Sequence, residues 1–227
     1  MVQTSFSKLL AFDSRILKQA QKSNSKLATA DNKVVSRHGS QQQLSLFPAP
    51  SSGLMGVDEV GRGCLSGPVV AAAVILPQIA KKSFLAEELS DLNDSKALSQ
   101  KQRERLAGIL RANCRFAIAE ASPAEIDQIN ILQASLLAMR RAIDALLLNV
   151  AIAPEQLLLL VDGNQKVKGL KLEQITVIQG DSHSASIAAA SVIAKVYRDA
   201  LMLELSHQHP AYSWHSNKGY GSKAHRA

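Results

Sequence analysis

Apolar residues in the first part of the folded region form two short runs that flank a charged, glycine-punctuated turn. Residues 54–57 have the pattern of a buried strand that ends in Asp58 and Glu59, and residues 68–76 form the second apolar run. Two runs of this length around a turn predict a β-hairpin. The hairpin would carry its polar groups, including Gly61-Arg62-Gly63, at one end.

Helical and strand patterns alternate through the next hundred residues. Residues 80–91 have the composition of a polar connection, and Ser99 can cap a helix over residues 99–112. A third strand is predicted over residues 115–121. A long helix is predicted to start after Pro123 and to run to about residue 148, with a broad apolar face that we interpret as core.

Two further strand patterns end in acids. Residues 157–161 are continuously apolar, which predicts a strand covered on both faces, and Asp162 follows them. Residues 172–178 alternate loosely and are followed by Asp181. Residues 182–206 then predict a helix whose first half consists of small residues. These allow close packing against the sheet, close approach to a nucleic-acid backbone, or both.

Composition limits the number of domains and the type of compartment. The 227 residues are 46% apolar, which suffices for one well-filled core, so we expect one domain and a tail. Cys64 and Cys114 have neither metal-ligand spacing nor the density of a disulfide framework, which fits a reducing compartment. No apolar run reaches the roughly 20 residues that span a bilayer. We expect a cytoplasmic monomer with no membrane association.

Residues 1–52 differ in composition from the rest. They have a net charge of +5, against +2 for residues 53–227, and are rich in Ser, Gln, Lys and Ala. Apart from an amphipathic segment near residues 5–20, we expect a flexible basic extension, because it offers little apolar surface to bury. An organellar transit peptide is the other interpretation, against which Asp13 and Asp31 count.

An isolated apolar motif lies near the end of this extension. Its apolar and amide positions are Gln43, Leu44, Leu46 and Phe47. Exposed Leu and Phe side chains in a polar stretch usually mark a contact. The motif over residues 43–47 resembles the one by which bacterial replication and repair proteins dock on the sliding clamp. The alternative is that it packs the extension onto its own domain.

Four acids follow or end predicted strands, namely Asp58, Glu59, Asp162 and Asp181. Their convergence would form a divalent-metal site, and ligands that are all oxygens select Mg²⁺ or Mn²⁺ over zinc. Two such ions about 4 Å apart could activate water and stabilise the leaving oxygen in phosphodiester hydrolysis. Adjacent strand residues point to opposite faces, so Asp58 and Glu59 should share a site only if the strand breaks or one contributes its carbonyl oxygen.

A series of motifs, taken in order, resembles ribonuclease HII, the type 2 ribonuclease H family. The motifs are Gly56-Val57-Asp58-Glu59-Val60-Gly61-Arg62-Gly63, Asn93-Asp94-Ser95-Lys96, Val161-Asp162-Gly163-Asn164, Gly180-Asp181, Ala188-Ala189-Ala190-Ser191 with Ala194-Lys195 and Arg198-Asp199, and Lys218-Gly219-Tyr220. The resemblance covers about residues 53–223. Ordered motifs over that span are far more specific than one pair of acids.

The resemblance implies an α/β, RNase H-like fold with a mixed five-stranded sheet flanked by helices. It also implies cleavage on the 5′ side of a ribonucleotide in duplex DNA or in an RNA-DNA hybrid, which leaves a 3′-hydroxyl and a 5′-phosphate. The four acids match the metal-binding carboxylates. Gly61, Arg62 and Gly63 match the loop that recognises the ribose 2′-hydroxyl, and Tyr220 matches the tyrosine that packs on the neighbouring deoxyribose. Expected phosphate contacts are Lys96, Ser186, Ser191, Lys195 and Lys218.

Two departures from the family pattern leave other functions open. The family continues past the tyrosine with helices that help to hold the duplex, whereas this sequence ends at Ala227, and it carries the basic extension in front. Docking on the clamp could compensate for weaker duplex binding. One alternative is a catalytically weak adaptor that binds nucleic acid and clamp, and another is a nuclease that removes primers from hybrids and needs several consecutive ribonucleotides.

Overall fold

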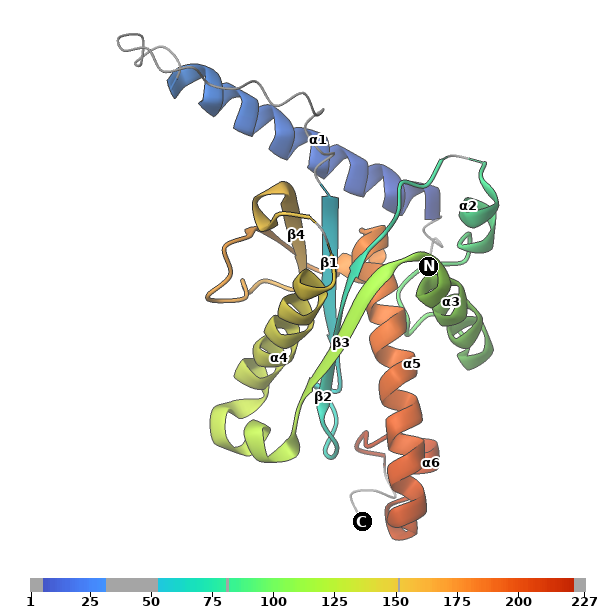
Figure 1. Ribbon diagram of the computed structural model, residues 1–227. Helices are drawn as coiled ribbons and strands as arrows, with labels where there is room; N and C mark the ends of the chain where they lie inside the picture. Colours follow the sequence, from blue (N-terminus) through green and yellow to red (C-terminus); the bar gives the residue numbers. More distant parts are fainter. Residues whose placement is uncertain (1–5, 32–52, 81, 151, 223–227) are drawn as a thin grey trace.

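A computed structural model describes residues 6–31, 53–80, 82–150 and 152–222. Five strands form one sheet in the order β3-β2-β1-β4-β5 (Figure 1). The strands are β1 (Gly53–Val60), β2 (Val69–Ile75), β3 (Arg115–Ala121), β4 (Leu157–Asp162) and β5 (Glu173–Val177). Pairing is antiparallel between β1 and β2 and between β2 and β3, and parallel between β1 and β4 and between β4 and β5. The predicted hairpin and the mixed five-stranded sheet are confirmed.

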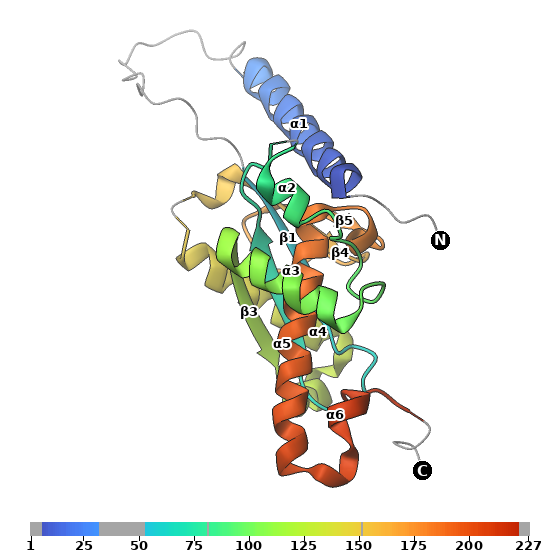
Figure 2. The same cartoon turned by 90° about the vertical axis from the view of Figure 1, so that its right-hand side faces the viewer.

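Helices cover both faces of the sheet (Figures 1 and 2). The odd-numbered positions of β2, such as Val69 and Ala71, pack with helix α4 (Pro123–Leu148). The even-numbered positions pack with α3 (Gln100–Asn113) and α5 (Ala185–Gln208). This division follows from the two-residue period of a strand. Two apolar cores therefore lie on either side of β1 and β2, as expected for an α/β protein.

Helix starts agree with the capping signals, but one long helix is interrupted. Ser99 and Ser122 both form capping boxes, with Gln102 and Glu125 respectively. Helix α4 was predicted to be continuous, yet Asn130 has φ 66° and ψ 162°. Its side-chain oxygen accepts hydrogen bonds from the backbone N–H groups of the residues two and three positions further on, at 3.0 and 3.1 Å. Asn130 therefore caps a second helical segment inside the predicted one.

Shorter elements connect the main ones. Helix α2 (Phe84–Glu88), capped by Ser83, occupies part of the predicted polar connection. Short 3₁₀ turns are η1 (Pro154–Gln156), η2 (Gly180–Ser182) and η3 (Pro210–Tyr212), and α6 (Trp214–Asn217) follows the last of these. None of the helices within the described ranges combines the length and apolar character that a bilayer crossing requires.

The N-terminal part differs from the predicted flexible extension. Helix α1 spans Phe6–Asp31, well beyond the amphipathic segment predicted near residues 5–20. Phe6 and Leu9 are buried on the domain, which supplies the tertiary contacts that the sequence pattern could not reveal. The clamp-like motif at residues 43–47 lies outside the described residues.

The small residues of α5 let that helix lie against the sheet. A Cβ atom added to Gly56 of β1 would lie 2.3 Å from the carbonyl carbon of Ser186 and 2.5 Å from the backbone nitrogen of Ile187. Only glycine permits an approach of this kind. The close-packing interpretation of residues 184–191 is confirmed at this position, and it brings α5 next to the strand that carries Asp58.

Candidate active site

Three carboxylates converge at the end of two neighbouring parallel strands. Asp58 and Glu59 lie in β1, and Asp162 is the last residue of β4. One side-chain oxygen from each lies within 4.8 Å of those of the other two. Such a cluster of oxygen donors is the ligand set that hard divalent cations prefer.

Asp58 and Glu59 converge without the strand break that the sequence led us to expect. Strand β1 continues to Val60, and both acids stay in register with β2, opposite Ala72 and Ala71. Pairing with β4, however, ends at Val57. The next residue of β4 is Asp162, so Asp58, Glu59 and Asp162 all lie where the pairing between the two strands stops. The expected break at the two acids is therefore wrong, and one oxygen of each acid still lies within 4.8 Å of the other.

Asp181 joins this region from the connection between β5 and α5. It lies in η2, and the backbone N–H of Gly180 donates a hydrogen bond to Asp162 Oδ1 at 2.7 Å. Lys96 Nζ lies 4.0 Å from Asp181 Oδ2. Asp181 is not among the three acids that lie within 4.8 Å of one another, but it borders them through Asp162.

Burial and mutual repulsion disfavour the charged forms of these acids. Burial raises the pKa of Asp58 well above its usual range, and the charges of Glu59 and Asp162 raise it further. Burial and Asp162 also raise the pKa of Glu59. Burial first, and then Asp94 and Asp162, raise the pKa of Asp181 to about 6, against the opposing effect of Lys96. A bound cation would relieve this repulsion, so the cluster is suited to hold one.

The donor geometry fits a divalent metal ion. Mg²⁺ holds its oxygen ligands at about 2.0–2.1 Å, which places opposite ligands roughly 4 Å apart. The 4.8 Å limit on the distances between the carboxylate oxygens is close to that span. A small closure of the side chains would therefore suffice.

A small cavity beside Glu59 and Asp162 is lined by Ser135 of α4, a residue that the sequence analysis did not identify as part of the site. It has a volume of about 20 Å³, enough for roughly one water molecule. Ser135 is 2% exposed, and its hydroxyl has no hydrogen-bond partner among the described residues. The Ser135 hydroxyl can therefore form a hydrogen bond with a water molecule next to the carboxylates. A serine within an apolar helical pattern gives no sequence signal for this role.

The Gly-Arg-Gly loop is held by a buried arginine. Gly61 has φ +106°, and a Cβ atom there would lie 2.6 Å from Arg198 Nε. The fully buried Arg198 side chain donates hydrogen bonds of 2.9 Å each to the carbonyl oxygens of Ser66, Pro68 and Lys218. Arg198 thus joins the loop after β1 to the segment that carries Tyr220. Arg62 remains 54% exposed and lies 3.7 Å from Glu59.

Tyr220 lies beside this loop. Cys64 and Tyr220 form an isolated antiparallel bridge, and the Leu65 N–H donates to the Gly219 carbonyl at 2.8 Å. Lys195 Nζ lies 5.3 Å from the centre of the Tyr220 ring, which is 38% exposed. Burial raises the pKa of Tyr220 to about 12, so the phenol stays protonated. The ring is therefore a neutral, partly accessible surface beside Gly61-Arg62-Gly63.

The five expected phosphate contacts differ in their surroundings. Lys96 is 79% exposed and lies beside Asp181. Lys195 is bound to Asp199 at 2.7 Å, and Lys218 Nζ donates to the His215 carbonyl at 2.8 Å. Both lysines border the loop but already have partners.

The two serines face inward. Ser191 is buried and shares a 2.9 Å hydrogen bond with Ser95, and it also bonds to Asp58. Ser186 is buried and donates to Asp13. A phosphate contact is therefore not available to Ser186 or Ser191 in this structure. The helix that carries them lies too close to the sheet to expose its small residues.

Comparison with known proteins gives one consistent result. The family model for ribonuclease HII matches residues 55–227. A ribonuclease HII of Ruegeria pomeroyi is 52% identical over 174 residues, which cover 77% of this chain and 69% of the relative. Among solved structures, the ribonuclease H2 of Pyrococcus horikoshii has a TM-score of 0.59 at 29% identity, with 77% and 83% of the two chains covered.

The ribonuclease HII in the PCNA:RNase HII complex of Archaeoglobus fulgidus is also similar, with a TM-score of 0.58, 26% identity, and 77% and 85% of the two chains covered. The strand order of the sheet, the converging carboxylates and these similarities all point to the same family. The chain belongs to the ribonuclease HII family and is a ribonuclease H endonuclease.

Proposed function

We propose that this endonuclease cleaves on the 5′ side of a ribonucleotide, in duplex DNA or in an RNA-DNA hybrid, and leaves a 3′-hydroxyl and a 5′-phosphate. The observation that carries the proposal is the cluster of Asp58, Glu59 and Asp162, two of which lie on β1 just before the Gly-Arg-Gly loop. The residues proposed to cleave the phosphodiester are therefore next to the residues proposed to recognise its sugar.

Asp58, Glu59 and Asp162, with Asp181, would hold the divalent cations, Mg²⁺ or Mn²⁺, in a two-metal site. When bound, such ions activate water and stabilise the leaving oxygen. The protein positions the oxygens. The Glu59 N–H donates to Asp58 Oδ1 at 2.7 Å, and the Gly180 N–H donates to Asp162 Oδ1 at 2.7 Å. The carboxylates of Asp58 and Asp162 are thereby oriented by backbone N–H groups before any cation binds.

Recognition of the ribose would fall to Gly61, Arg62 and Gly63, with Tyr220 on the neighbouring sugar. The 2′-hydroxyl distinguishes RNA from DNA, and it can both donate and accept hydrogen bonds. A loop with little side-chain bulk allows the backbone to approach it closely. A Cβ atom on Gly63 would have nothing within 4 Å, so the space beside this residue is open. Lys96, beside Asp181, is the base best exposed for a phosphate.

A sliding clamp is the proposed protein partner. The Archaeoglobus fulgidus homologue has been solved in a PCNA complex, and PCNA is a sliding clamp. Residues Gln43, Leu44, Leu46 and Phe47 would make the contact here. Replacement of Leu46 and Phe47 by alanine should abolish retention of the protein on immobilised bacterial clamp. Unchanged retention would contradict the proposal.

The cleavage proposal is tested with three labelled duplexes that contain no ribonucleotide, one ribonucleotide or four consecutive ribonucleotides. We expect metal-dependent cutting of the second and third, at the 5′ side, and none of the first. Cutting of only the third would favour the hybrid nuclease. Binding of all three without cutting would favour the adaptor.

A further inference from the structure

Helix α1 lies outside the residues that match the family, yet its first half is docked on the catalytic domain. Phe6 and Leu9 are buried. Asp13 accepts hydrogen bonds from the Ser186 backbone nitrogen at 2.9 Å and from the Ser186 hydroxyl at 2.8 Å. Because Ser186 lies in the first turn of α5, the Asp13 carboxylate also caps that helix. The docking holds α1 beside the helix that carries Ser191 and Arg198.

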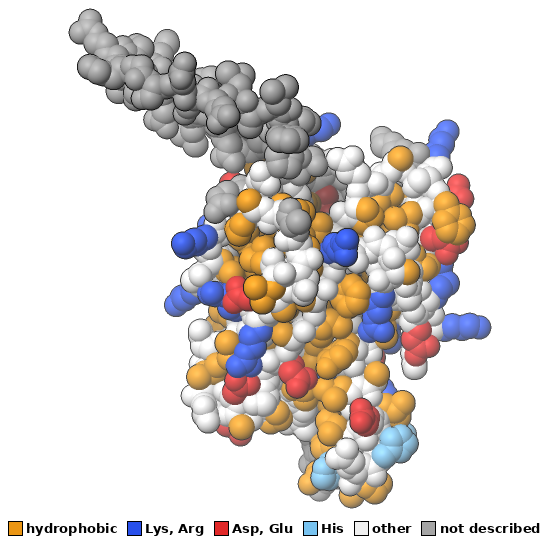
Figure 3. All heavy atoms as spheres, viewed as in Figure 1, with side chains coloured by type: hydrophobic (Ala, Val, Ile, Leu, Met, Phe, Trp, Pro, Cys, Tyr) orange, Lys and Arg blue, Asp and Glu red, His pale blue; other side chains and the backbone are white. Residues whose placement is uncertain are grey.

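The outward surface of α1 is basic over residues 6–22. Lys8, Arg15, Lys18 and Lys22 are exposed, whereas the acid of this stretch, Asp13, is buried against α5. Within the described ranges, Lys8, Arg15 and Lys18 form no salt bridge. On the face seen in Figure 3, by contrast, lysine and arginine side chains are interspersed with acids. Among the described residues, no ion pair neutralises Lys8, Arg15 or Lys18.

One hollow lies between this surface and the residues that follow Asp181. It has a volume of about 460 Å³ and lies between α1 and η2, where Lys8 and Arg15 face Ser182 and His183. The rings of Phe12 and His183 are 6.4 Å apart, and the Arg15 guanidinium lies 5.4 Å from the Phe12 ring. Ser182 and His183 directly follow Asp181. The side of the hollow that faces α1 is therefore formed by the first and second residues after a proposed metal ligand.

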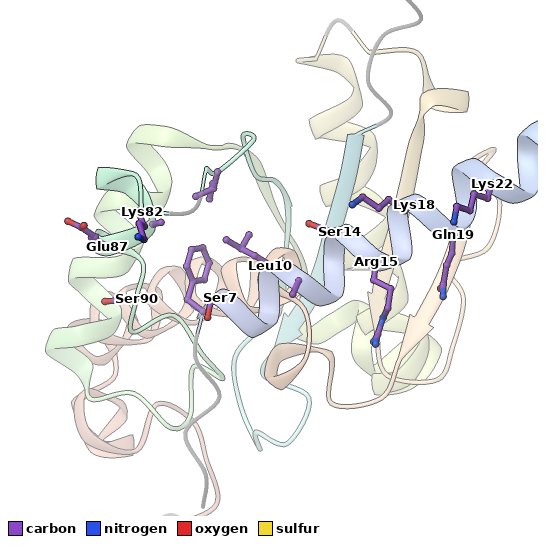
Figure 4. Close-up of a pocket in the computed structure, with 14 residues that line it drawn as sticks. Ser7, Leu10, Ser14, Arg15, Lys18, Gln19, Lys22, Lys82, Glu87 and Ser90 are labelled. Carbon is purple, nitrogen blue, oxygen red and sulfur yellow. The ribbon is translucent and has the colours of Figure 1, made fainter.

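A second, larger hollow continues along the helix. It has a volume of about 1020 Å³ and lies between α1 and residues 79–90. Figure 4 shows Arg15 and Lys18 following one another along α1, with Lys82 and Glu87 across the hollow. Glu87 is the acid among the described residues that line it. Arg15 lines both hollows, so the two hollows lie next to each other along α1, and we call the basic side chains beside them the α1 track.

We propose that this α1 track, formed by Lys8, Arg15, Lys18 and Lys82 with His183, binds the phosphodiester backbone of the substrate to one side of the cleavage site. The inference rests on the proposed nuclease function. Long basic side chains on an exposed helix suit phosphates, which are bound by charge without reference to sequence. Continuity with the loop after Asp181 favours the substrate over an acidic peptide, which would need no connection to the active site.

The test compares two triple variants of the full chain. The track variant loses three basic side chains of the α1 track and carries Lys8→Gln, Arg15→Gln and Lys18→Gln. The control variant loses the same charge from exposed positions on α3 and β3 and carries Lys101→Gln, Arg111→Gln and Arg115→Gln. Circular dichroism checks that both fold. KM and kcat are measured against salt for a long duplex with one ribonucleotide and for a duplex trimmed closely around it.

For the long duplex, the track variant should have a higher KM than the parent. The slope of its log KM against log salt concentration should be shallower by about 2–3, because each phosphate that the protein no longer neutralises lowers the slope by roughly 0.9. Its kcat, its KM for the trimmed duplex and all values of the control variant should stay within twofold of the parent. Equal salt slopes in the two variants would overturn the proposal. So would an unchanged slope together with lost binding of a synthetic acidic, leucine-containing peptide.

An inactive parent would contradict the proposed cleavage instead. The track would then still be tested, because the Kd of the uncleaved duplex and its salt slope can be measured by fluorescence anisotropy.

Discussion

Replacement of Arg198 should disturb the geometry of the loop after β1 without removing a metal ligand, so it separates the effect of the loop on cleavage from that of the metal site. Its side chain is fully buried, and each of its three hydrogen bonds to carbonyl oxygens is 2.9 Å long. Arg198→Met keeps much of the apolar stem but leaves three acceptors without a donor. A hydrogen bond to a charged group contributes about 1.5–3 kcal/mol, and partial hydration of the carbonyls would offset some of the loss, so we expect the free energy of unfolding to fall by about 4 kcal/mol.

The assay is urea denaturation together with cleavage of the single-ribonucleotide duplex. Arg198→Lys can restore only part of the network and should be intermediate. Arg105→Met is the control, since Arg105 is 43% exposed and pairs with Glu88 and Asp91 away from the loop. It should cost at most about 1 kcal/mol.

For Arg198→Met under folding conditions, kcat/KM should fall while metal affinity, measured by calorimetry, is kept. A loss of stability below about 1 kcal/mol, with unchanged cleavage, would refute the reasoning.

Three further outcomes follow from close packing and from the buried acids. Gly56→Ala should destabilise the protein by about 1–3 kcal/mol in urea because its Cβ would lie 2.3 Å from Ser186, whereas Gly108→Ala, with nothing within 4 Å, should be neutral or stabilising. The pKa of Asp181 is raised to about 6, so its contribution to stability is present below about pH 4 and lost as the pH rises through 6. In EDTA, Asp181→Asn should therefore be more stable than the parent at pH 7, with the difference vanishing near pH 4; a constant difference would contradict the sign. Mg²⁺ or Mn²⁺ should raise the Tm of the parent but not that of Asp58→Asn, and equal shifts would place the ion elsewhere.

The strands and their acids were predictable because the signals are local. The apolar runs before Asp58 and Asp162 predict buried strands, and parallel neighbours bring their ends together. What the sequence could not reveal was where the pairing of β1 with β4 stops. It stops at Val57 and Val161, immediately before Asp58 and Asp162, and it depends on contacts between segments about a hundred residues apart.

Contacts between distant segments account for the other differences. Arg198 bonds to carbonyl oxygens at positions 66, 68 and 218, and no spacing rule predicts such partners. Ser186 resembled a phosphate contact because hydroxyls at a helix start often are. Its partner is Asp13, from a helix 173 positions earlier. The break at Asn130 had a local signal, since Asn is a good cap, but the apolar period of the surrounding helix concealed it.

The most direct test of the active site is a set of four single substitutions, Asp58→Asn, Glu59→Gln, Asp162→Asn and Asp181→Asn, with Asp144→Asn on the outer side of α4 as a matched control. The kcat for the single-ribonucleotide duplex is measured in saturating Mg²⁺ or Mn²⁺. We predict that each of the four lowers kcat by at least about 100-fold while the control stays near the parent. Near-parental kcat in any variant of the clustered acids Asp58, Glu59 or Asp162 would contradict the assignment of the cluster as the catalytic centre.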